Sequence, residues 1–269
     1  MKNWTKHNLL DLQSLSREEI ELILETAKSF KQVSARDVKK VPALRGKTVV
    51  TLFFENSTRT RASFELAAKR LSADTINIAT SSSSLAKGET VLDTARNIEA
   101  MNVNAIIVRH GSSGVPKILA DHLGASIINA GDGCRAHPTQ ALLDMFTIKE
   151  KLGRIEGLKV AIIGDILHSR VARSNIFGLT KLGAEVTVCG PTTLMPVGIE
   201  QLGANVCHNI HEVIPQSDVL MLLRLQQERQ KDKFLPSIRE YAKTFGINAA
   251  KLKKAKKDVL IMHPGPTNR

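Results

Sequence analysis

The chain alternates short apolar runs with stretches in which apolar residues recur at helical spacing. Strands buried on both faces read as near-continuous apolar runs, and helical stretches between them supply the crossovers of a parallel sheet. The pattern therefore predicts an α/β protein with two domains, each a mostly parallel sheet with helices on both faces. The predicted strands cover residues 46–55, 73–79, 103–110, 125–131, 158–165, 184–191, 204–209, 217–223 and 258–264.

Two predicted helices set the domain organisation. Residues 15–31 form an amphipathic pattern with Ser16 as N-cap and Glu19 three positions later, which is the spacing of a capping box. Residues 137–153 form a second helical pattern between the first four apolar runs and the last five. A chain of 269 residues is long enough for two domains. We therefore expect one domain over residues 1–139 and another over residues 140–269.

The chain carries a formal charge of +12, and its densest basic run covers residues 251–257. Ala249, Leu252 and Ala255 recur at helical spacing there, so we interpret the lysines as the solvated face of a short helix. Aromatic residues make up only 4%, which argues against the stacking surfaces that bind single-stranded nucleic acid. Small anionic substrates are the expected partners, and nucleic acid is not.

Cysteine use and hydropathy indicate a reducing compartment and no membrane partner. Cys134, Cys189 and Cys207 include no CxxC pair, which favours the cytoplasm over a disulfide framework. Cys207 lies beside His208 and His211, but no further ligand cluster is near, so we predict no metal site. The N-terminal stretch has no apolar core and no long apolar run occurs, so we expect neither a signal peptide nor a membrane span.

Arginines occur at the ends of several predicted strands. In open α/β sheets, ligands bind beyond the carboxyl ends of the strands. Arg59, Arg109, Arg170 and Arg224 each lie at or just after such an end. The planar guanidinium matches carboxylate and phosphate oxygens, so this arrangement predicts a substrate with several anionic groups.

Residues 57–61, with the sequence STRTR, lie where the first predicted strand turns into a helix. The N–H groups at a helix start have no partner within the helix, so they can bind a phosphate together with the hydroxyls and Arg59. Two alternatives stay open. Ser57 or Thr58 could be an ordinary N-cap, and Arg61 could pair with Glu65 on the helix face.

The turn at residues 164–174 also follows a strand and opens a helix, but it lacks the glycines of a dinucleotide fingerprint. The next strand ends in Cys189-Gly190-Pro191, with no acidic residue for a ribose, and no Walker lysine motif occurs. We therefore expect neither a dinucleotide nor ATP.

Six motifs, in order along nearly the whole chain, resemble those of the aspartate/ornithine carbamoyltransferases. They are STRTR at 57–61, RHGSSG at 109–114, HPTQALLD at 137–144, GDILHSR at 164–170, LRLQQER at 223–229 and HPGP at 263–266. Within this family the motifs are most similar to the catalytic chains of the aspartate enzymes. An ornithine enzyme is expected to carry H-C-L-P in place of the last motif and to lack the arginine-rich LRLQQER.

The resemblance implies a transferase that moves the carbamoyl group of carbamoyl phosphate to the α-amine of L-aspartate, an early step of de novo pyrimidine biosynthesis. The implied ligands of carbamoyl phosphate are Ser57, Thr58, Arg59, Thr60, Arg109, His137, Gln140, Gly265 and Pro266, with the backbone at Pro264. The implied ligands of L-aspartate are Lys87, Arg170, Arg224 and Gln226. The implied catalytic residues are Arg59, Thr60, Arg109 and His137.

The implied chemistry uses no metal and no cofactor. As the amine attacks, negative charge grows on the carbonyl oxygen, where Arg109, Thr60 and His137 would stabilise it. The leaving phosphate can take the amine proton, so no side chain need act as general base.

The resemblance also implies a ring of three identical chains, which can join a larger assembly with other chains. Lys87, with Ser83 or Ser84, matches a loop that such enzymes insert into the neighbouring subunit's site. The family normally continues past HPGPxNR with a helix that returns to the first domain. No match to that helix occurs before Arg269, so we expect impaired domain closure, solubility or trimer assembly.

Two other functions stay open. A carbamoyltransferase for another amine, such as ornithine, would not need both Arg170 and Arg224, because that amine carries one fewer carboxylate. A non-enzymatic polyanion-binding protein would use the +12 charge and bind nucleic acid with a steep salt dependence.

Overall fold

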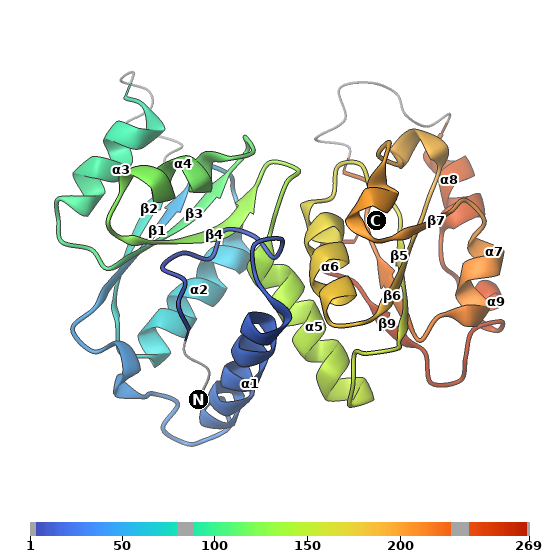
Figure 1. The fold of residues 1–269 in the computed structure, drawn as a ribbon, viewed down its shortest axis with the longest axis horizontal. Helices are drawn as coiled ribbons and strands as arrows, with labels where there is room; N and C mark the ends of the chain where they lie inside the picture. The colour runs from blue at the N-terminus through green and yellow to red at the C-terminus, as the bar shows by residue number, and fades with distance from the viewer. Residues whose placement is uncertain (1–3, 80–88, 227–236, 268–269) are drawn as a thin grey trace. The chain divides into compact units, whose positions relative to one another are not determined.

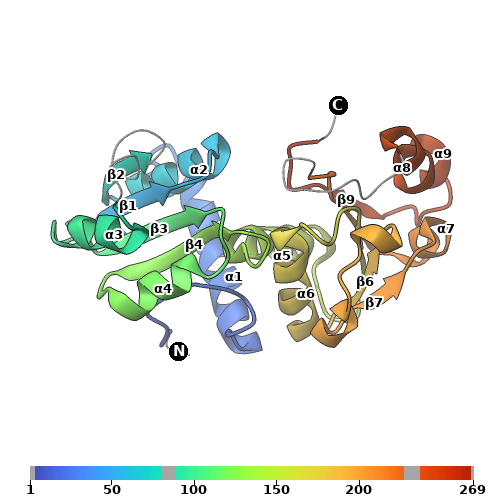
Figure 2. The ribbon, with the colours of Figure 1, turned by 90° about the horizontal axis from the view of Figure 1, so that it is seen from above.

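The fold consists of two units, Met1–Thr139 and Gln140–Arg269, in a computed structural model that describes residues 4–79, 89–226 and 237–267. Each unit holds one parallel sheet with helices packed on it (Figure 1, Figure 2). The fold class predicted from the apolar runs is therefore confirmed.

The first unit is built on a sheet with the strand order β2-β1-β3-β4, in which neighbouring strands are parallel. Its strands are β1 (Thr48–Phe53), β2 (Asp74–Ala79), β3 (Ala105–His110) and β4 (Ser126–Asp132). Its helices are α1 (Arg17–Ser34), α2 (Thr58–Arg70), α3 (Val91–Glu99) and α4 (Val115–His122), with the short 3-10 helix η1 (Pro42–Leu44). The register pairs Phe53 with Arg109, so the carboxyl ends of β1 and β3 are neighbours.

Alternate side chains of this sheet enter two separate cores, because successive residues of a strand point to opposite faces. One face packs against α3 and α4, and its core includes Val50, Leu52, Ala95, Ile98, Ile106, Val108, Leu119 and Ile127. The other face packs against α2 through Val49, Phe53, Phe64, Ala68 and Ile107. Figure 1 shows these helices on the two sides of the sheet.

The predicted start of α1 and both ends of the second predicted helix agree with the structure, whereas α1 continues past residue 31 to Ser34. The Ser16 side chain accepts from the Glu19 N–H (3.2 Å), and the Glu19 carboxylate accepts from the Ser16 N–H (2.8 Å), which forms the predicted capping box of α1. The helix predicted over residues 137–153 is α5 (Pro138–Leu152). It ends at Gly153, whose φ of 76° suits a residue without a side chain.

The second unit is built on a sheet with the strand order β7-β6-β5-β8-β9, again with parallel neighbours. Its strands are β5 (Lys159–Ile163), β6 (Glu185–Cys189), β7 (Asn205–Cys207), β8 (Val219–Leu222) and β9 (Leu260–Met262). Its helices are α6 (Arg170–Lys181), α7 (Ile210–Val213), α8 (Ile238–Phe245) and α9 (Ala249–Leu252), with the 3-10 helices η3 (Thr192–Leu194), η4 (Ile199–Leu202) and η5 (Ile214–Gln216).

Helices cover both faces of this second sheet. One face packs against α7, η5 and α8 through Ala161, Ile163, Cys189, Ile210, Val213, Leu220 and Phe245. Helix α6 packs on β6, on the other side of the sheet in Figure 1. Among the helices of the described ranges, none is long and apolar enough to cross a membrane.

The basic run at residues 251–257 only partly matches the predicted solvated face. Leu252 and Ala255 do pack against the core of the second unit, but α9 already ends at Leu252. The Lys251 ammonium donates to three backbone carbonyls at the end of α8, with distances of 2.8, 2.8 and 2.9 Å. Lys256 pairs with Asp218 (2.5 Å). At these two positions the solvated-face interpretation is wrong, because the chain folds the lysines back onto polar groups of its own.

We expect Lys251→Met to lower the free energy of unfolding by about 1–2 kcal/mol, because carbonyls at the end of α8 lose a charged donor. Lys253→Met is the matched control, since Lys253 is an exposed lysine of the same run, and its effect should stay within about 0.5 kcal/mol. Urea unfolding of both variants measures the difference. Equal effects would show that Lys251 stabilises the fold no more than a solvated lysine does.

Candidate active site

The first turn of α2 presents backbone N–H groups that its N-cap residue leaves unbonded. Ser57 occupies the N-cap position, yet its side chain makes no capping hydrogen bond, whereas Ser16 and Thr90 do cap α1 and α3. Ser57 is therefore not an ordinary side-chain cap. The free N–H groups of a helix start are suited to an anion, and the predicted ligands Thr58 and Arg59 are exposed beside them.

Arg61 lies on the next turn of the same helix. The carboxylate of Glu65 pairs with Lys69 at 2.6 Å, rather than with Arg61. The hydrogen bond from Lys69 is also the main reason that the pKa of Glu65 lies below its usual value, while Arg61 adds only a minor Coulombic effect. The predicted alternative of an Arg61–Glu65 pair is thus not what the structure forms.

Arg109, at the end of β3, is held from two sides. Its Nη1 donates to the carbonyl oxygen of Ala130 (3.0 Å), and its Nε lies 3.3 Å from the Glu55 carboxylate. Glu55 follows β1, and the strand register brings it beside Arg109. The role of Glu55 was missed from the sequence, because the contact depends on the order of β1 and β3 in the sheet.

His137 is buried, with 7% of its surface exposed, and its Nδ1 lies 3.4 Å from the Thr139 hydroxyl. The loop before it is fixed by Asp132, a fully buried carboxylate at the end of β4. Asp132 accepts from the N–H groups of Gly114 and Ala136, each at 2.9 Å. One side chain therefore fixes the segments that lead into α4 and α5.

A second buried carboxylate organises the predicted L-aspartate ligands. Asp165, after β5, accepts from the His168 ring (2.9 Å) and from the Gln226 N–H (3.1 Å). These contacts connect the turn that leads to Arg170 with the segment that follows β8 and carries Arg224. Arg170 is buried at the first position of α6, and Arg224 is half-buried. The predicted ligands Arg170, Arg224 and Gln226 thus come from two loops that Asp165 joins.

Close backbone approach explains the glycine in this turn. Gly164 has a φ of 135°, and a Cβ there would lie 2.5 Å from the Leu223 carbonyl oxygen. Any other residue would push the segment after β8 away from the segment after β5. Gly164 is therefore needed for this close approach, although the turn lacks the other glycines of a dinucleotide fingerprint.

Gln140 contacts a third buried carboxylate, Asp144, one turn further along α5. Its Nε2 donates to Asp144 at 2.9 Å, and the Asn175 amide of α6 donates to the other oxygen at 2.8 Å. Burial raises the pKa of Asp144 to about 6, although both amide hydrogen bonds act in the opposite direction. The sequence analysis missed Asp144, whose partner Asn175 is distant in the chain.

The remaining predicted residues lie at the end of the chain or outside the described ranges. The Gly265 N–H donates to the His263 ring at 2.7 Å, and Pro266 is exposed. Lys87, Ser83 and Ser84 lie outside the described residues.

Comparison with protein families assigns both halves of the chain. Residues 7–150 match the carbamoyl-P binding domain of aspartate/ornithine carbamoyltransferase, and residues 156–269 match the Asp/Orn binding domain. This chain belongs to the aspartate/ornithine carbamoyltransferase family. The resemblance drawn from the six motifs is confirmed.

Similar carbamoyltransferases include bacterial proteins called aspartate carbamoyltransferase catalytic subunit. The protein of Syntrophus aciditrophicus is 58% identical over 266 residues, which cover 99% of this chain and 87% of the relative. That of Geobacter sulfurreducens is 59% identical over 266 residues, with 98% and 86% covered. The chain is therefore an enzyme of this family.

Solved structures of the aspartate transcarbamoylase of Trypanosoma cruzi have the same fold. Its complex with carbamoyl phosphate and aspartate gives a TM-score of 0.87 at 31% identity, with 97% of this chain and 86% of that chain covered. Its complex with N-(phosphonacetyl)-L-aspartic acid gives 0.88 at 31% identity, with 97% and 85% covered.

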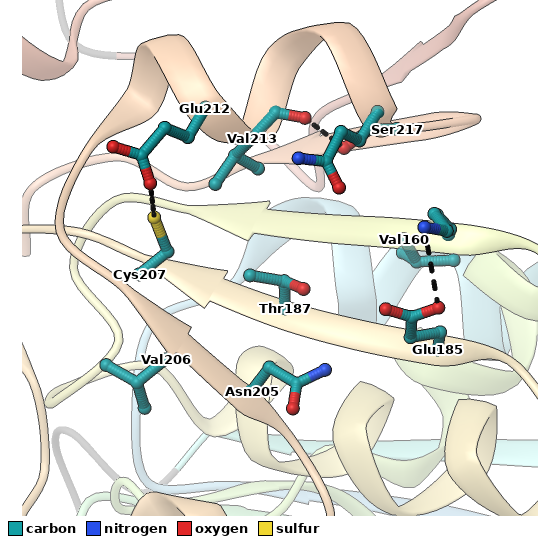
Figure 3. Close-up of a pocket in the computed structure, with 11 residues that line it drawn as sticks. Val160, Glu185, Thr187, Asn205, Val206, Cys207, Glu212, Val213 and Ser217 are labelled. Atoms are coloured by element: carbon teal, nitrogen blue, oxygen red, sulfur yellow. Dashed lines mark hydrogen bonds and ion pairs between the residues drawn. The ribbon is translucent and has the colours of Figure 1, made fainter.

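The second unit of this carbamoyltransferase chain has a cavity of about 240 Å³, and none of the predicted ligands lines it. It is lined by the first residues of β5, β6 and β7, which are Lys159, Glu185 and Asn205, and by residues of α7 and η5. Figure 3 shows Cys207 and Glu212 facing each other there, with 3.9 Å between sulfur and oxygen. Since substrates of parallel sheets bind at the carboxyl ends of the strands, this cavity at their amino ends is not the active site.

The neighbouring histidines have other partners. The His208 ring bonds to the Gly190 carbonyl oxygen at 2.8 Å. Within the ranges that the structure describes, no group of three or more His, Cys, Asp or Glu side chains is placed to hold a metal ion.

We expect the raised pKa of Asp144 to appear as a pH-dependent loss of stability. Below about pH 4 the carboxyl is protonated in both the folded and the unfolded chain and costs nothing. As the pH rises toward 6, only the unfolded chain readily releases the proton, so the folded state loses up to about 3 kcal/mol. The difference in unfolding free energy between wild type and Asp144→Asn should therefore fall by that order between about pH 4 and 7.

Denaturant unfolding of the two proteins at each pH measures this difference, and groups common to both cancel. A difference that does not change with pH would show that Asp144 titrates normally in the folded chain.

Proposed function

We propose that this chain transfers the carbamoyl group of carbamoyl phosphate to the α-amine of L-aspartate, giving N-carbamoyl-L-aspartate and phosphate. The observation that carries the proposal is the 58% identity, over 99% of this chain, to an aspartate carbamoyltransferase catalytic subunit. The reaction is an early step of de novo pyrimidine biosynthesis and takes place in the cytoplasm. The cysteines Cys134, Cys189 and Cys207 are all free thiols, which suits that reducing compartment.

Residues 1–139 form the carbamoyl-phosphate domain. The phosphate binds at the start of α2, where Ser57, Thr58, Arg59 and Thr60 surround backbone N–H groups. This assignment is supported by the missing side-chain cap of α2 and by the exposure of Arg59. A helix start combines unpaired N–H groups with the positive end of the helix dipole, and Arg59 adds a full charge.

The carbamoyl carbonyl oxygen is stabilised by Arg109, Thr60 and His137 as it gains negative charge. Arg109 is supported in this role by the contacts with Glu55 and Ala130, which fix its guanidinium before substrate arrives. Gln140 and the backbone of residues 264–266 bind the amide end of the same group. Because phosphate leaves and can carry the proton away, the enzyme acts mainly by holding two anions in attack geometry.

Residues 140–269 form the L-aspartate domain, in which Arg170, Arg224 and Gln226 bind the two carboxylates. Their support is the Asp165 contact that joins their two loops. Lys87 completes this set from a neighbouring subunit of a homotrimer, and the serine beside it is Ser83 or Ser84. The trimer can also join a larger assembly with other chains.

The test of the activity is phosphate release from carbamoyl phosphate by the purified chain. Release should require L-aspartate and should not be supported by L-ornithine. Release with ornithine instead would establish the other carbamoyltransferase activity. If neither amine supports phosphate release, and the chain binds nucleic acid with an affinity that weakens steeply with salt, the polyanion-binding alternative would be established.

We expect Arg59→Ala and Arg224→Ala to damage the two substrates differently. Loss of Arg59 removes a charged donor at the phosphate. The fall in kcat/KM for carbamoyl phosphate should therefore correspond to a loss of about 3 kcal/mol or more of transition-state stabilisation. Loss of Arg224 should raise the KM for L-aspartate far more than that for carbamoyl phosphate.

Lys69→Ala is the control, because it removes an exposed positive charge from the last turn of α2. Steady-state kinetics with each substrate varied in turn distinguishes the three variants. Near-normal kcat/KM in Arg59→Ala, or equal damage to both substrates in Arg224→Ala, would refute the respective assignment.

The shared site predicts complementation between inactive chains. Arg59→Ala and Lys87→Ala should each be nearly inactive alone, but unfolding, mixing and refolding equal amounts should restore about a quarter of the sites. A restored site takes Lys87 from one mutant and Arg59 from the other, so it holds neither lesion. Native mass spectrometry confirms that hybrid trimers are present. No recovery in such a mixture would mean that Lys87 does not act across subunits.

A further inference from the structure

Asp144 is a buried carboxylate that the proposed chemistry does not use. Only 5% of its surface is exposed. Its two oxygens accept from two amides on different helices, Gln140 of α5 at 2.9 Å and Asn175 of α6 at 2.8 Å. A carboxylate kept in the interior at an electrostatic cost, with one contact to a substrate ligand, requires an explanation.

The chemistry of the three groups fixes the orientation of the Gln140 amide. An ionised carboxylate only accepts hydrogen bonds, so the Gln140 atom next to it must be the nitrogen. The carbonyl oxygen of Gln140 is then turned away from Asp144. The side chain can reach a substrate only with this oxygen, and therefore only as an acceptor.

Asn175 is fixed as a donor by a second acceptor. Its Nδ2 donates both to Asp144 and to the Val171 carbonyl oxygen, at 2.8 and 3.1 Å. Its Oδ1 is buried and has no hydrogen-bond partner among the residues that the structure describes. A rotated amide would bring Oδ1 against the Val171 oxygen, so this orientation persists despite the unpaired oxygen.

We propose that Asp144 is a positioning residue that turns the Gln140 carbonyl oxygen toward the substrate and so selects carbamoyl phosphate against acyl phosphates without an NH₂ group. The inference rests on the proposed function, in which Gln140 binds the carbamoyl group. Carbamoyl phosphate and acetyl phosphate have nearly the same shape, but the first carries an NH₂ donor where the second carries a methyl group. A methyl group leaves the Gln140 oxygen without a partner, and an unpaired buried acceptor costs binding energy.

Asp144→Asn tests this because the neighbouring amides dictate its orientation. Asn175 can only donate, so Asn at position 144 must turn its oxygen to Asn175 and its NH₂ to Gln140. Gln140 then has to rotate and present its own NH₂ to the substrate. The Gln140 NH₂ then faces the NH₂ of carbamoyl phosphate, and two donors cannot form a hydrogen bond. The methyl group of acetyl phosphate makes no hydrogen bond with either orientation, so its binding is not weakened.

The quantity to measure is the ratio of the inhibition constant of acetyl phosphate to the KM of carbamoyl phosphate, at about pH 8, where Asp144 is ionised. Asp144→Asn should lower this ratio by about tenfold, the effect of one misplaced hydrogen bond. A general loosening of the fold weakens both ligands alike and leaves the ratio unchanged. An unchanged ratio in a folded Asp144→Asn protein would therefore overturn the inference.

Two further variants supply a matched control and a rescue. Asn175→Ala removes the other hydrogen bond to the same carboxylate, so it should reduce stability yet keep the ratio within about twofold of wild type. In the double variant Asp144→Asn with Asn175→Ala, the new amide can turn its oxygen to Gln140. The ratio should recover although the protein is less stable, and failure to recover would contradict the orientation mechanism.

Gln140→Ala separates this inference from the proposed function. It should lower the ratio at least as much as Asp144→Asn does. If Gln140→Ala leaves the ratio unchanged, the assignment of Gln140 in the proposed function is wrong, and the inference falls with it. If Gln140→Ala lowers the ratio but Asp144→Asn does not, only the inference is wrong. Should Asp144→Asn fail to fold, Asp144→Leu replaces it, because an apolar side chain of similar shape accepts from neither amide and leaves Gln140 unoriented, so a fall in the ratio is again expected.

Discussion

Buried carboxylates that accept hydrogen bonds from neighbouring segments are the interactions on which the candidate site depends. In the first unit, Asp132 accepts from N–H groups at Gly114 and Ala136. In the second unit, Asp165 accepts from the His168 ring and from the N–H of Gln226. Loops at the end of a parallel sheet have no ladder of their own to satisfy their N–H groups. One carboxylate that accepts from two segments therefore fixes them at the predicted substrate site.

In this arrangement the acidic residues orient donors of the protein, and the basic residues are the predicted ligands of the substrates. The acids at 132, 144 and 165 lie inside and accept from backbone, imidazole or amide donors of the protein itself. The predicted substrate ligands are mostly donors, as binding of a phosphate and two carboxylates demands. Burying the Asp144 carboxylate costs stability, because its charged form loses contact with water. The buried carboxylate in turn fixes the direction of the hydrogen bonds that its neighbours make.

The central strands β1, β3, β5 and β8 could be predicted because they are largely buried, so their sequences are mostly apolar. α1 could also be predicted, because Ser16 and Glu19 act within four residues of each other. The arginines at strand ends could be selected as candidate ligands, because ligands of such sheets bind beyond the carboxyl ends of the strands. Local signals thus sufficed for the elements, for the end of β3 that carries Arg109 and for the start of α2.

Contacts between distant segments could not be predicted. Asp144 and Gln140 are one turn apart, but their relation matters only because Asn175 arrives from α6 through packing. The Asp165 contact with Gln226 joins residues that β6, β7 and β8 separate in the sequence, and Lys251 reaches the carbonyls of α8 by a turn of the backbone. In each case the partner is selected by tertiary structure, and a sequence pattern carries no record of it.

A crystal structure of the chain grown with carbamoyl phosphate tests the central claim most directly, because it locates the phosphate. The account predicts phosphate oxygens about 3 Å from the backbone nitrogens at the start of α2, with the Arg59 guanidinium beside them. Phosphate bound elsewhere, for example in the cavity lined by Lys159 and Glu185, with the start of α2 unoccupied, would contradict it.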